Sequence, residues 1–184
     1  TDKLLAVLPA KYIPADVFAG ISINAIPSLA IKSLTAGQFA ALTPNQVQAL
    51  TSSQVSELTK VQLSQVSSDN FGALSFSSGK TAGGLNGINI KLLNNEQLSY
   101  LTTDQIAALS NNQFSQFSSS QLKSLSNEQY SALTSLQAST LKSFSGFTND
   151  AIAALSNSFI SAVQPQAFST LTKEQLASFI PEQM

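Results

Sequence analysis

An eight-residue pattern repeats along most of this chain and limits the folds that it can adopt. Successive octets read LTPNQVQA, LTSSQVSE and LTKVQLSQ, within an array that covers Leu34–Ala73. The pattern returns over Leu93–Thr140 and again over Leu155–Ser178. Position one is apolar, position two is Ser or Thr, position five is usually Gln, and position six is apolar. A repeat with a fixed period indicates a structural unit that stacks on copies of itself.

Each octet carries the residues of a helix N-terminus. In the unit that starts at Leu42, Thr43 is a favourable N-cap, and Gln46 three residues later completes a capping box. Pro44 falls at the first helical position, where its missing N–H costs nothing. Leu42 and Val47 have the spacing of a hydrophobic staple. The same box is predicted at Thr102/Gln105, Ser110/Gln113, Ser118/Gln121, Ser126/Gln129 and Thr172/Gln175.

A period of eight excludes the simpler helical and strand architectures. Eight residues turn an α-helix by about 800°, so Leu42, Leu50 and Leu58 would drift roughly 80° per octet around one long helix. In a strand, positions one and six would point to opposite faces. A disordered Ser/Gln-rich tract is the remaining alternative, but apolar residues recur too regularly for it. We therefore predict an all-α fold, a superhelical solenoid of very short capped helices with an eight-residue repeat.

The repeat divides the chain into segments of a single predicted repeat domain, 1–184. Residues 1–33 are expected to be degenerate units that form an N-terminal cap with a few irregular helices. Residues 34–73 form the first array, 74–92 a loop insertion, and 93–184 the second array. In the insertion, the alternation in GINIKL (87–92) allows a short strand. In the second array, Leu141–Ala154 is expected to be one unit expanded by six residues, and Pro181 to begin another helix. The last unit is cut short, so we expect the chain to be a piece of a longer protein.

The composition argues against several classes of function. Only 10% of the residues are charged, the net charge is -1, and all nine basic residues are Lys. This balance argues against binding nucleic acid or an anionic membrane surface. No apolar run is long enough to span a bilayer, so no membrane insertion is expected. The chain has no Cys and no His, which removes disulfides, thiolate metal sites and the commonest general base.

No motif in the sequence supports catalysis, a metal or a cofactor. SSGKT (Ser77–Thr81) lacks the first glycine of a phosphate-binding loop. Acids such as Asp104 and Glu128 fall at helix starts, where the helix dipole favours them. A loose calcium site at Asp69 and Asn70 is a weaker possibility, because EF-hand spacing is absent. A Ser–Lys pair is a further weak alternative. We therefore predict no catalytic, metal or cofactor-binding residue.

The aromatic residues divide into core and candidate ligand positions. The core positions are at or near the apolar sites of the octets: Phe39, Phe71, Phe114, Tyr130, Phe159 and Phe168. Tyr100 stands at position eight and Tyr12 in the N-terminal cap, so these two side chains are the candidates for contact with a ligand such as a polysaccharide. Trp, which stacks best on sugars, is absent.

The octet pattern and its proline variant, VQPQAFSTLTKEQLASFIPEQM (Val163–Met184), resemble the short-helix repeats of the mesothelin and stereocilin group of cell-surface proteins. IPADVFAG (Ile13–Gly20) is similar to the degenerate units of that group. The resemblance implies a superhelical array of short helices that is displayed at the cell surface and used in adhesion. It supplies no catalytic residues. The chain differs from the animal members in having no Cys, no N-x-Ser/Thr acceptor and few charges.

These observations together predict a non-enzymatic structural or adhesive module of a larger secreted or cell-surface protein. Its uncharged polar face would contact a protein partner or a second copy of the chain, weakly and many times over. The alternative is a polysaccharide-binding module that uses Tyr12 and Tyr100.

Overall fold

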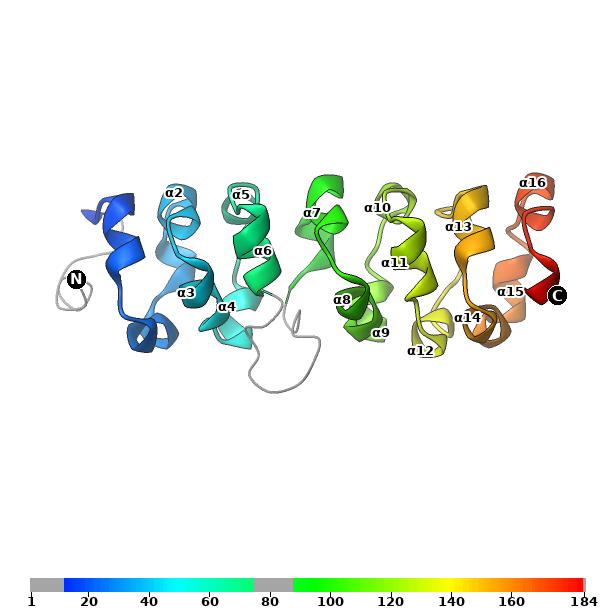
Figure 1. The fold of residues 1–184 in the computed structure, drawn as a ribbon, viewed down its shortest axis with the longest axis horizontal. Coiled ribbons are helices and arrows are strands. Elements are labelled where there is room, and N and C mark those ends of the chain that lie inside the picture. The colour runs from blue at the N-terminus through cyan, green and yellow to red at the C-terminus, as the bar shows by residue number, and fades with distance from the viewer. Residues whose placement is uncertain (1–11, 75–87, 184) are drawn as a thin grey trace. The chain divides into compact units, whose positions relative to one another are not determined.

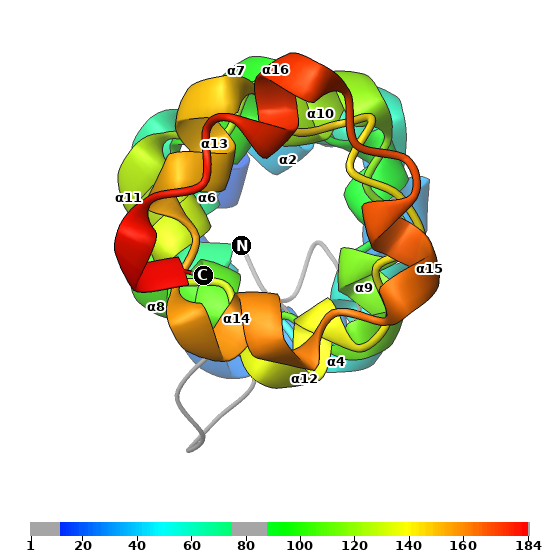
Figure 2. The same cartoon turned by 90° about the vertical axis from the view of Figure 1, so that its right-hand side faces the viewer.

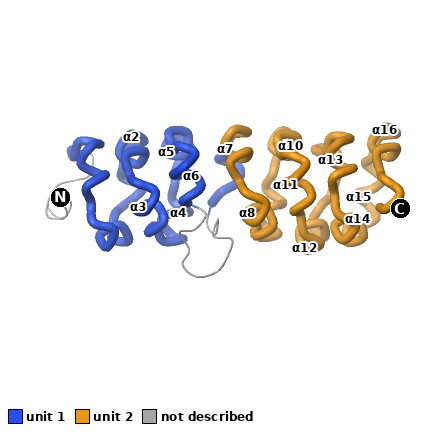
Figure 3. Tube along the Cα trace, in the orientation of Figure 1, with its two compact units in different colours: residues 1–93 blue, residues 94–184 orange. Residues whose placement is uncertain are grey.

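The computed structural model describes residues 12–74 and 88–183, and all regular secondary structure within these ranges is helical (Figure 1). The chain divides into two compact units, Thr1–Leu93 and Asn94–Met184 (Figure 3). The predicted all-α class of many short helices is confirmed. The prediction of a single repeat domain over 1–184 stays a prediction.

Unit 1 begins with irregular helices and continues with short α-helices. Its 3-10 helices are η2 (Ala15–Gly20), η3 (Ile23–Ser28), η4 (Ile31–Ser33) and η5 (Ile90–Leu92). Its described α-helices are α2 (Ala36–Ala40), α3 (Pro44–Gln48), α4 (Ser52–Ser56), α5 (Lys60–Leu63) and α6 (Ser68–Leu74). The irregular helices expected before residue 34 are therefore present.

Unit 2 consists of short α-helices and one final 3-10 helix. Its first helices are α7 (Asn95–Ser99), α8 (Thr103–Ala108), α9 (Asn111–Phe114), α10 (Ser119–Lys123), α11 (Asn127–Ser131) and α12 (Ser135–Ala138). They are followed by α13 (Asn149–Ala154), α14 (Asn157–Ala162), α15 (Pro165–Phe168), α16 (Lys173–Leu176) and η6 (Pro181–Gln183). As predicted, Pro181 begins a helix, although this helix is of the 3-10 type.

The loop insertion expected over 74–92 is described only at its edges. Leu74 is the buried last residue of α6, and residues 75–87 lie outside the described part of the chain. The short strand suggested for 87–92 is wrong over Ile90–Leu92, which form η5. The reason is local: the Asn89 side chain accepts the Lys91 N–H at 3.1 Å and so begins a helical turn in place of a strand.

The octet starts its helices as its sequence predicts. In α3, the Gln46 N–H donates to Thr43 Oγ1 at 3.4 Å, and the Thr43 N–H donates to Gln46 Oε1 at 2.7 Å. Pro44 occupies the first turn. All six predicted capping boxes form, and boxes also begin α2, α4, α5, α7 and α12. Each box satisfies two backbone donors that a helix of this length would otherwise leave exposed.

Burial follows the octet position. Positions one and six supply the core, as with Leu133 (3% exposed) and Ala138 (0%) around α12. Five of the six aromatic residues predicted to be core are buried: Phe39, Phe71, Phe114, Tyr130 and Phe159. Phe168 is only half-buried, and its ring contacts Phe144 and Phe179 at centroid distances of 5.4 and 6.5 Å.

The glutamine at position five is buried too, and it has a second role besides the capping box. Gln137 is 1% exposed, and its Nε2 donates to the carbonyls of Ile106 at 2.8 Å and Leu109 at 2.9 Å. These carbonyls lie 31 and 28 residues earlier in the chain. We call this pair of bonds a glutamine clamp. Clamps with the same separations are made by Gln62, Gln129, Gln175 and Gln183.

Glutamine clamps hold together helices that are far apart in the sequence. One clamp carbonyl, such as Ile106, lies in the last turn of a helix and also accepts the N–H three residues later, and the other, such as Leu109, lies in the bend that follows the helix. Helices several octets apart therefore contact each other, as α11 does with α8 and α12 with α9. The helices α12 and α14 also lie side by side (Figure 2). Helices this short are unstable alone, so these contacts and the shared core stabilise them.

Candidate functional site

The regular repeat is broken in unit 2 by a unit of six residues, Leu141–Gly146, which contains no helix. The residues that follow, Phe147–Ala154, form an ordinary octet with Thr148 as the N-cap of α13 and Ala151 at the glutamine position. The fourteen residues expected to be one expanded unit are therefore a shortened unit followed by a normal one. The shortened unit keeps its apolar residues, Leu141 and Phe144, and lacks the cap, the helical turn and the glutamine.

A glutamine clamp is missing at this place. In the preceding octets, the carbonyls of positions six and one, such as Ile106 and Leu109, accept a clamp from a glutamine 28 to 31 residues later. The carbonyls of Phe114 and Phe117 hold the equivalent positions in the next octets. The residue found 31 and 28 positions after them is Ser145, whose side chain is too short to donate to both. The Phe114 carbonyl accepts the Phe117 N–H at 3.2 Å. Within residues 12–74 and 88–183, no hydrogen bond reaches the Phe117 carbonyl.

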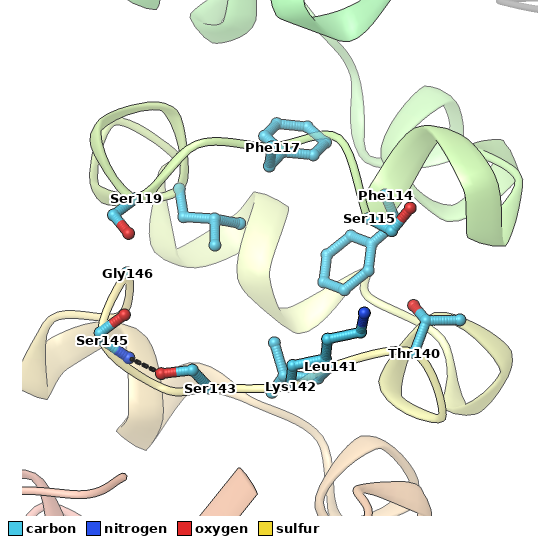
Figure 4. A pocket seen from close by; sticks show the side chains of 11 residues that line it. Phe114, Ser115, Phe117, Ser119, Thr140, Leu141, Lys142, Ser143, Ser145 and Gly146 are labelled. Atoms are coloured by element: carbon cyan, nitrogen blue, oxygen red, sulfur yellow. Dashed lines mark hydrogen bonds between the residues drawn. The ribbon is translucent and has the colours of Figure 1, made fainter.

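A pocket of about 280 Å³ lies beside the shortened unit (Figure 4). One wall comes from the segment that carries Phe114, Ser115 and Phe117, and the opposite wall from residues 140–146. Hydroxyl groups line it between the apolar side chains: Ser115, Ser119, Thr140, Ser143 and Ser145. A second hollow of about 540 Å³ shares Ser115 and residues 140–142 with the pocket and extends toward Gln164 and Gln166. The pocket offers hydroxyl groups and aromatic side chains, with few charges.

Lys142 is the charged residue that lines both hollows. Its side chain points from the shortened unit toward the segment that carries Phe114 and Ser115 (Figure 4). No ion pair forms between residues in the described part of the chain, and Lys142 is therefore not neutralised there. The lysine can donate a hydrogen bond to an acceptor held in the pocket.

Gly146 allows the shortened unit to approach α10 closely. A Cβ at this position would lie 2.8 Å from Leu122 Cδ1 and 3.1 Å from Ser119 Cα. A larger residue would therefore force Leu122 and the backbone at Ser119 to shift, so glycine suits this close packing. Nearby, the Ser145 N–H donates to Ser143 Oγ at 3.1 Å, which fixes the turn. Gly146 thus lines the pocket where the shortened unit packs closely on α10.

The two tyrosines predicted to contact a ligand do not line this pocket. Tyr12 has 67% of its surface exposed. Tyr100 is half-buried at the C-cap of α7, and its hydroxyl donates to Glu96 Oε1 at 2.6 Å. This hydrogen bond, together with the charge of Glu96, raises the pKa of Tyr100. The prediction that either residue binds a ligand is untested by this geometry.

The acidic residues behave as helix-start residues. Asp104, Glu128 and Glu174 lie in the first turns of their helices, as predicted. A hydrogen bond with the Ser126 side chain, followed by one with its own backbone N–H, lowers the pKa of Glu128. Its own backbone N–H and then the Thr172 side chain lower the pKa of Glu174. Both carboxylates are thus held charged where the helix dipole favours them.

The suggested calcium site at Asp69 and Asn70 is not supported. Asn70 is 5% exposed and takes the glutamine position of its octet, where its Nδ2 donates to the Leu42 carbonyl at 2.7 Å. The amide is thus used inside the fold. Among the described residues, no group of three His, Cys, Asp or Glu side chains could hold a metal ion. SSGKT (Ser77–Thr81) lies outside the described residues.

Two further findings concern the whole chain. Among the described residues, no helix has the length and apolar character needed to cross a membrane. No family model, curated protein or solved structure matches the chain.

The octet pattern alone did not reveal the second role of the glutamine or the missing clamp. The available signal was the constancy of position five beside the free variation of positions three and four. A capping box needs Glu or Gln at this position, yet the octets of 34–73 and 93–140 have Gln or Asn there and no Glu. That restriction indicates that an amide donor is required, which a carboxylate cannot supply.

Proposed function

We propose that this chain is a non-enzymatic structural or adhesive module of a larger secreted or cell-surface protein. It presents an uncharged polar surface to a protein partner or to a second copy of itself. The supporting observation is the separation of roles within the octet. Positions one, five and six are turned inward, and positions three and four are exposed in nearly every unit. These outward positions are often Ser or Asn, as in Ser52, Ser53, Asn111 and Asn112.

We further infer that the octets wind into a superhelical solenoid within each unit. The clamps join residues 28 and 31 positions apart, which corresponds to a little under four octets per turn. Repetition of one bond pattern at a constant separation is expected of a solenoid. Deletion of one complete octet, 125–132, should preserve helicity by circular dichroism. Deletion of half an octet, 125–128, should abolish it over several units. Equal tolerance of both deletions would refute the stacked-octet architecture.

The adhesive role is tested by assembly of the purified chain. We expect molar mass by light scattering to rise with concentration while far-UV circular dichroism stays helical. Because the exposed positions carry few charges, the assembly should change little between low and high salt. Two exposed apolar side chains, Val61 (66%) and Leu136 (71%), are suitable anchors in such a contact. Leu136→Ser should weaken assembly without loss of helicity. A helical monomer at every concentration would refute self-association.

Polysaccharide binding is the second candidate, and the exposure of Tyr12 favours it. A tyrosine with 67% of its surface in solvent can stack its ring on the apolar face of a sugar. Titration with a panel of glycans should then change the tyrosine fluorescence of the chain, and Tyr12→Ala should remove that change. Unaltered fluorescence across the panel would refute this candidate.

A further inference from the structure

We propose that the pocket beside the shortened unit binds a primary carboxamide, as presented by a glutamine side chain of a partner peptide. The inference rests on the proposed function as an interaction module and names the chemistry of its partner. In this view, the partner supplies the amide that the chain lacks at the glutamine position of the shortened unit.

The first support is a pair of carbonyls, those of Phe114 and Phe117, that no glutamine in the described part of the chain clamps; of the two, only the Phe114 carbonyl accepts another bond there, from the backbone N–H of Phe117. In the neighbouring clamp, one amide nitrogen donates to Ile106 and Leu109 at 2.8 and 2.9 Å. Phe114 and Phe117 hold the same octet positions, and both line the pocket. Two acceptors in this arrangement suit an –NH₂ group, which carries two hydrogens in one plane.

The second support is the donor opposite these acceptors. In a clamp, the amide oxygen accepts the N–H of the N-cap residue, as Gln137 Oε1 does from Thr134 at 2.8 Å. The shortened unit has no N-cap, but the Lys142 ammonium and the Ser143 hydroxyl line the pocket. Either can donate to the oxygen of a carboxamide. The pocket therefore supplies acceptors for the nitrogen and donors for the oxygen.

The third support is the available volume. A pocket of about 280 Å³ can hold a glutamine side chain with part of its backbone. The two Phe side chains provide apolar surface for its methylene groups. Gly146, which has no side chain to occupy this space, also lines the pocket beside Leu122.

The test uses the full chain, labelled with ¹⁵N, and the small peptide N-acetyl-glutamine-N-methylamide. We expect the amide signals of Ser115, Ser143 and Ser145 to shift on titration, with a dissociation constant on the order of 1 mM for so small a ligand. The isosteric glutamate peptide should bind at least tenfold more weakly, because its carboxylate faces two carbonyls. Equal shifts with the glutamate peptide, or with a neutral sugar, would overturn the proposal.

A repair variant supplies a matched control. Replacing Lys142–Ser143 by Thr-Asn-Glu-Gln restores a complete octet, whose own glutamine should occupy the clamp position. This variant should lose the peptide-induced shifts and melt at a higher temperature than the parent chain. Gln48→Ala, at an exposed glutamine of unit 1, should leave binding unchanged. Retained shifts in a folded repair variant would also overturn the proposal.

These outcomes are separable from a failure of the proposed function. Peptide binding is read at the pocket residues, and self-association is read by light scattering. Concentration-dependent assembly without peptide-induced shifts would refute the carboxamide site alone. A monomeric chain that binds the glutamine peptide would refute self-association and retain the site.

Discussion

The buried glutamine of the octet should contribute more to stability than its polar nature suggests. Gln46 is 2% exposed in α3, and its Oε1 accepts the Thr43 N–H at 2.7 Å. Its Nε2 donates to the carbonyls of Phe18 at 2.9 Å and Ile21 at 2.7 Å. Gln46→Ala removes these three bonds, each with a net value of about 0.5–1.5 kcal/mol, so we expect a loss of about 2–4 kcal/mol. For a chain of this size, that loss lowers Tm by roughly 5–15 °C.

Gln48 provides the matched control, because it lies in the same helix and is exposed. Gln48→Ala is the same substitution in the same helix, so its effect on helix propensity is similar to that of Gln46→Ala. Because no buried hydrogen bond is lost, the Tm of Gln48→Ala should stay within about 2 °C of the parent value. Thermal and urea melts followed by circular dichroism at 222 nm measure both variants. If Gln46→Ala melted together with Gln48→Ala, the clamp would add nothing to stability, and the account of the buried amide would be wrong.

The carboxyl variant of the same residue separates hydrogen-bond donation from size. Gln46→Glu keeps the shape of the side chain but brings a carboxylate oxygen against two carbonyls, which raises the pKa of the introduced carboxyl. Because its folded pKa lies above the unfolded one, the variant should be most stable at low pH and lose stability as pH rises through the folded pKa. Melts of the parent chain and of Gln46→Ala over the same pH range are the controls. A pH-independent difference between Gln46→Glu and the parent would contradict this reasoning.

Three further predictions concern packing in unit 2. Leu109 is 4% exposed, so Leu109→Asp places a charge in the core and should lower the free energy of unfolding by roughly 3 kcal/mol or more. The loss should appear as reduced helicity over several octets. Unchanged helicity and Tm would refute the stacked core. Gly146→Ala should destabilise by about 1–3 kcal/mol in a urea melt because its Cβ meets α10, whereas Gly37→Ala, with nothing within 4 Å, should be neutral or stabilising. Burial raises the pKa of Tyr130 from 10.0 to about 12, so the unfolded chain loses this proton first. The contribution of Tyr130 to the free energy of unfolding is therefore intact below pH 10 and falls as pH rises toward 12. When Tm is measured against pH, this fall should be absent in Tyr130→Phe.

The local structure could be predicted because its causes lie within eight residues. Thr43 and Gln46 form the predicted box because both partners are close in the chain. Pro181 begins a helix for the same reason. The strand suggested near Ile90 was wrong because alternation over so few residues carries little information, and the Asn89 cap decided the local structure.

The pocket depends on contacts between distant residues, which the octet alone does not specify. LKSFSGFTNDAIAA is visibly irregular, but its division into a shortened unit and an octet follows from where Phe144 and Phe147 lie in the core. The missing clamp becomes visible only when the partner carbonyls of the other glutamines are known. Those carbonyls lie 28 and 31 residues away, and no local rule identifies them.

The sequence by itself determined that this chain forms short capped helices with an apolar side and a polar exposed side that carries few charges. Helix starts and burial patterns depend on neighbouring residues, and the same neighbouring residues recur in most octets. Only the tertiary structure decided what the glutamines hold and where a glutamine is lacking. The physical reason is that a buried amide needs partners for both of its hydrogens, and for most octets these partners are carbonyls that stacking brings from earlier in the chain.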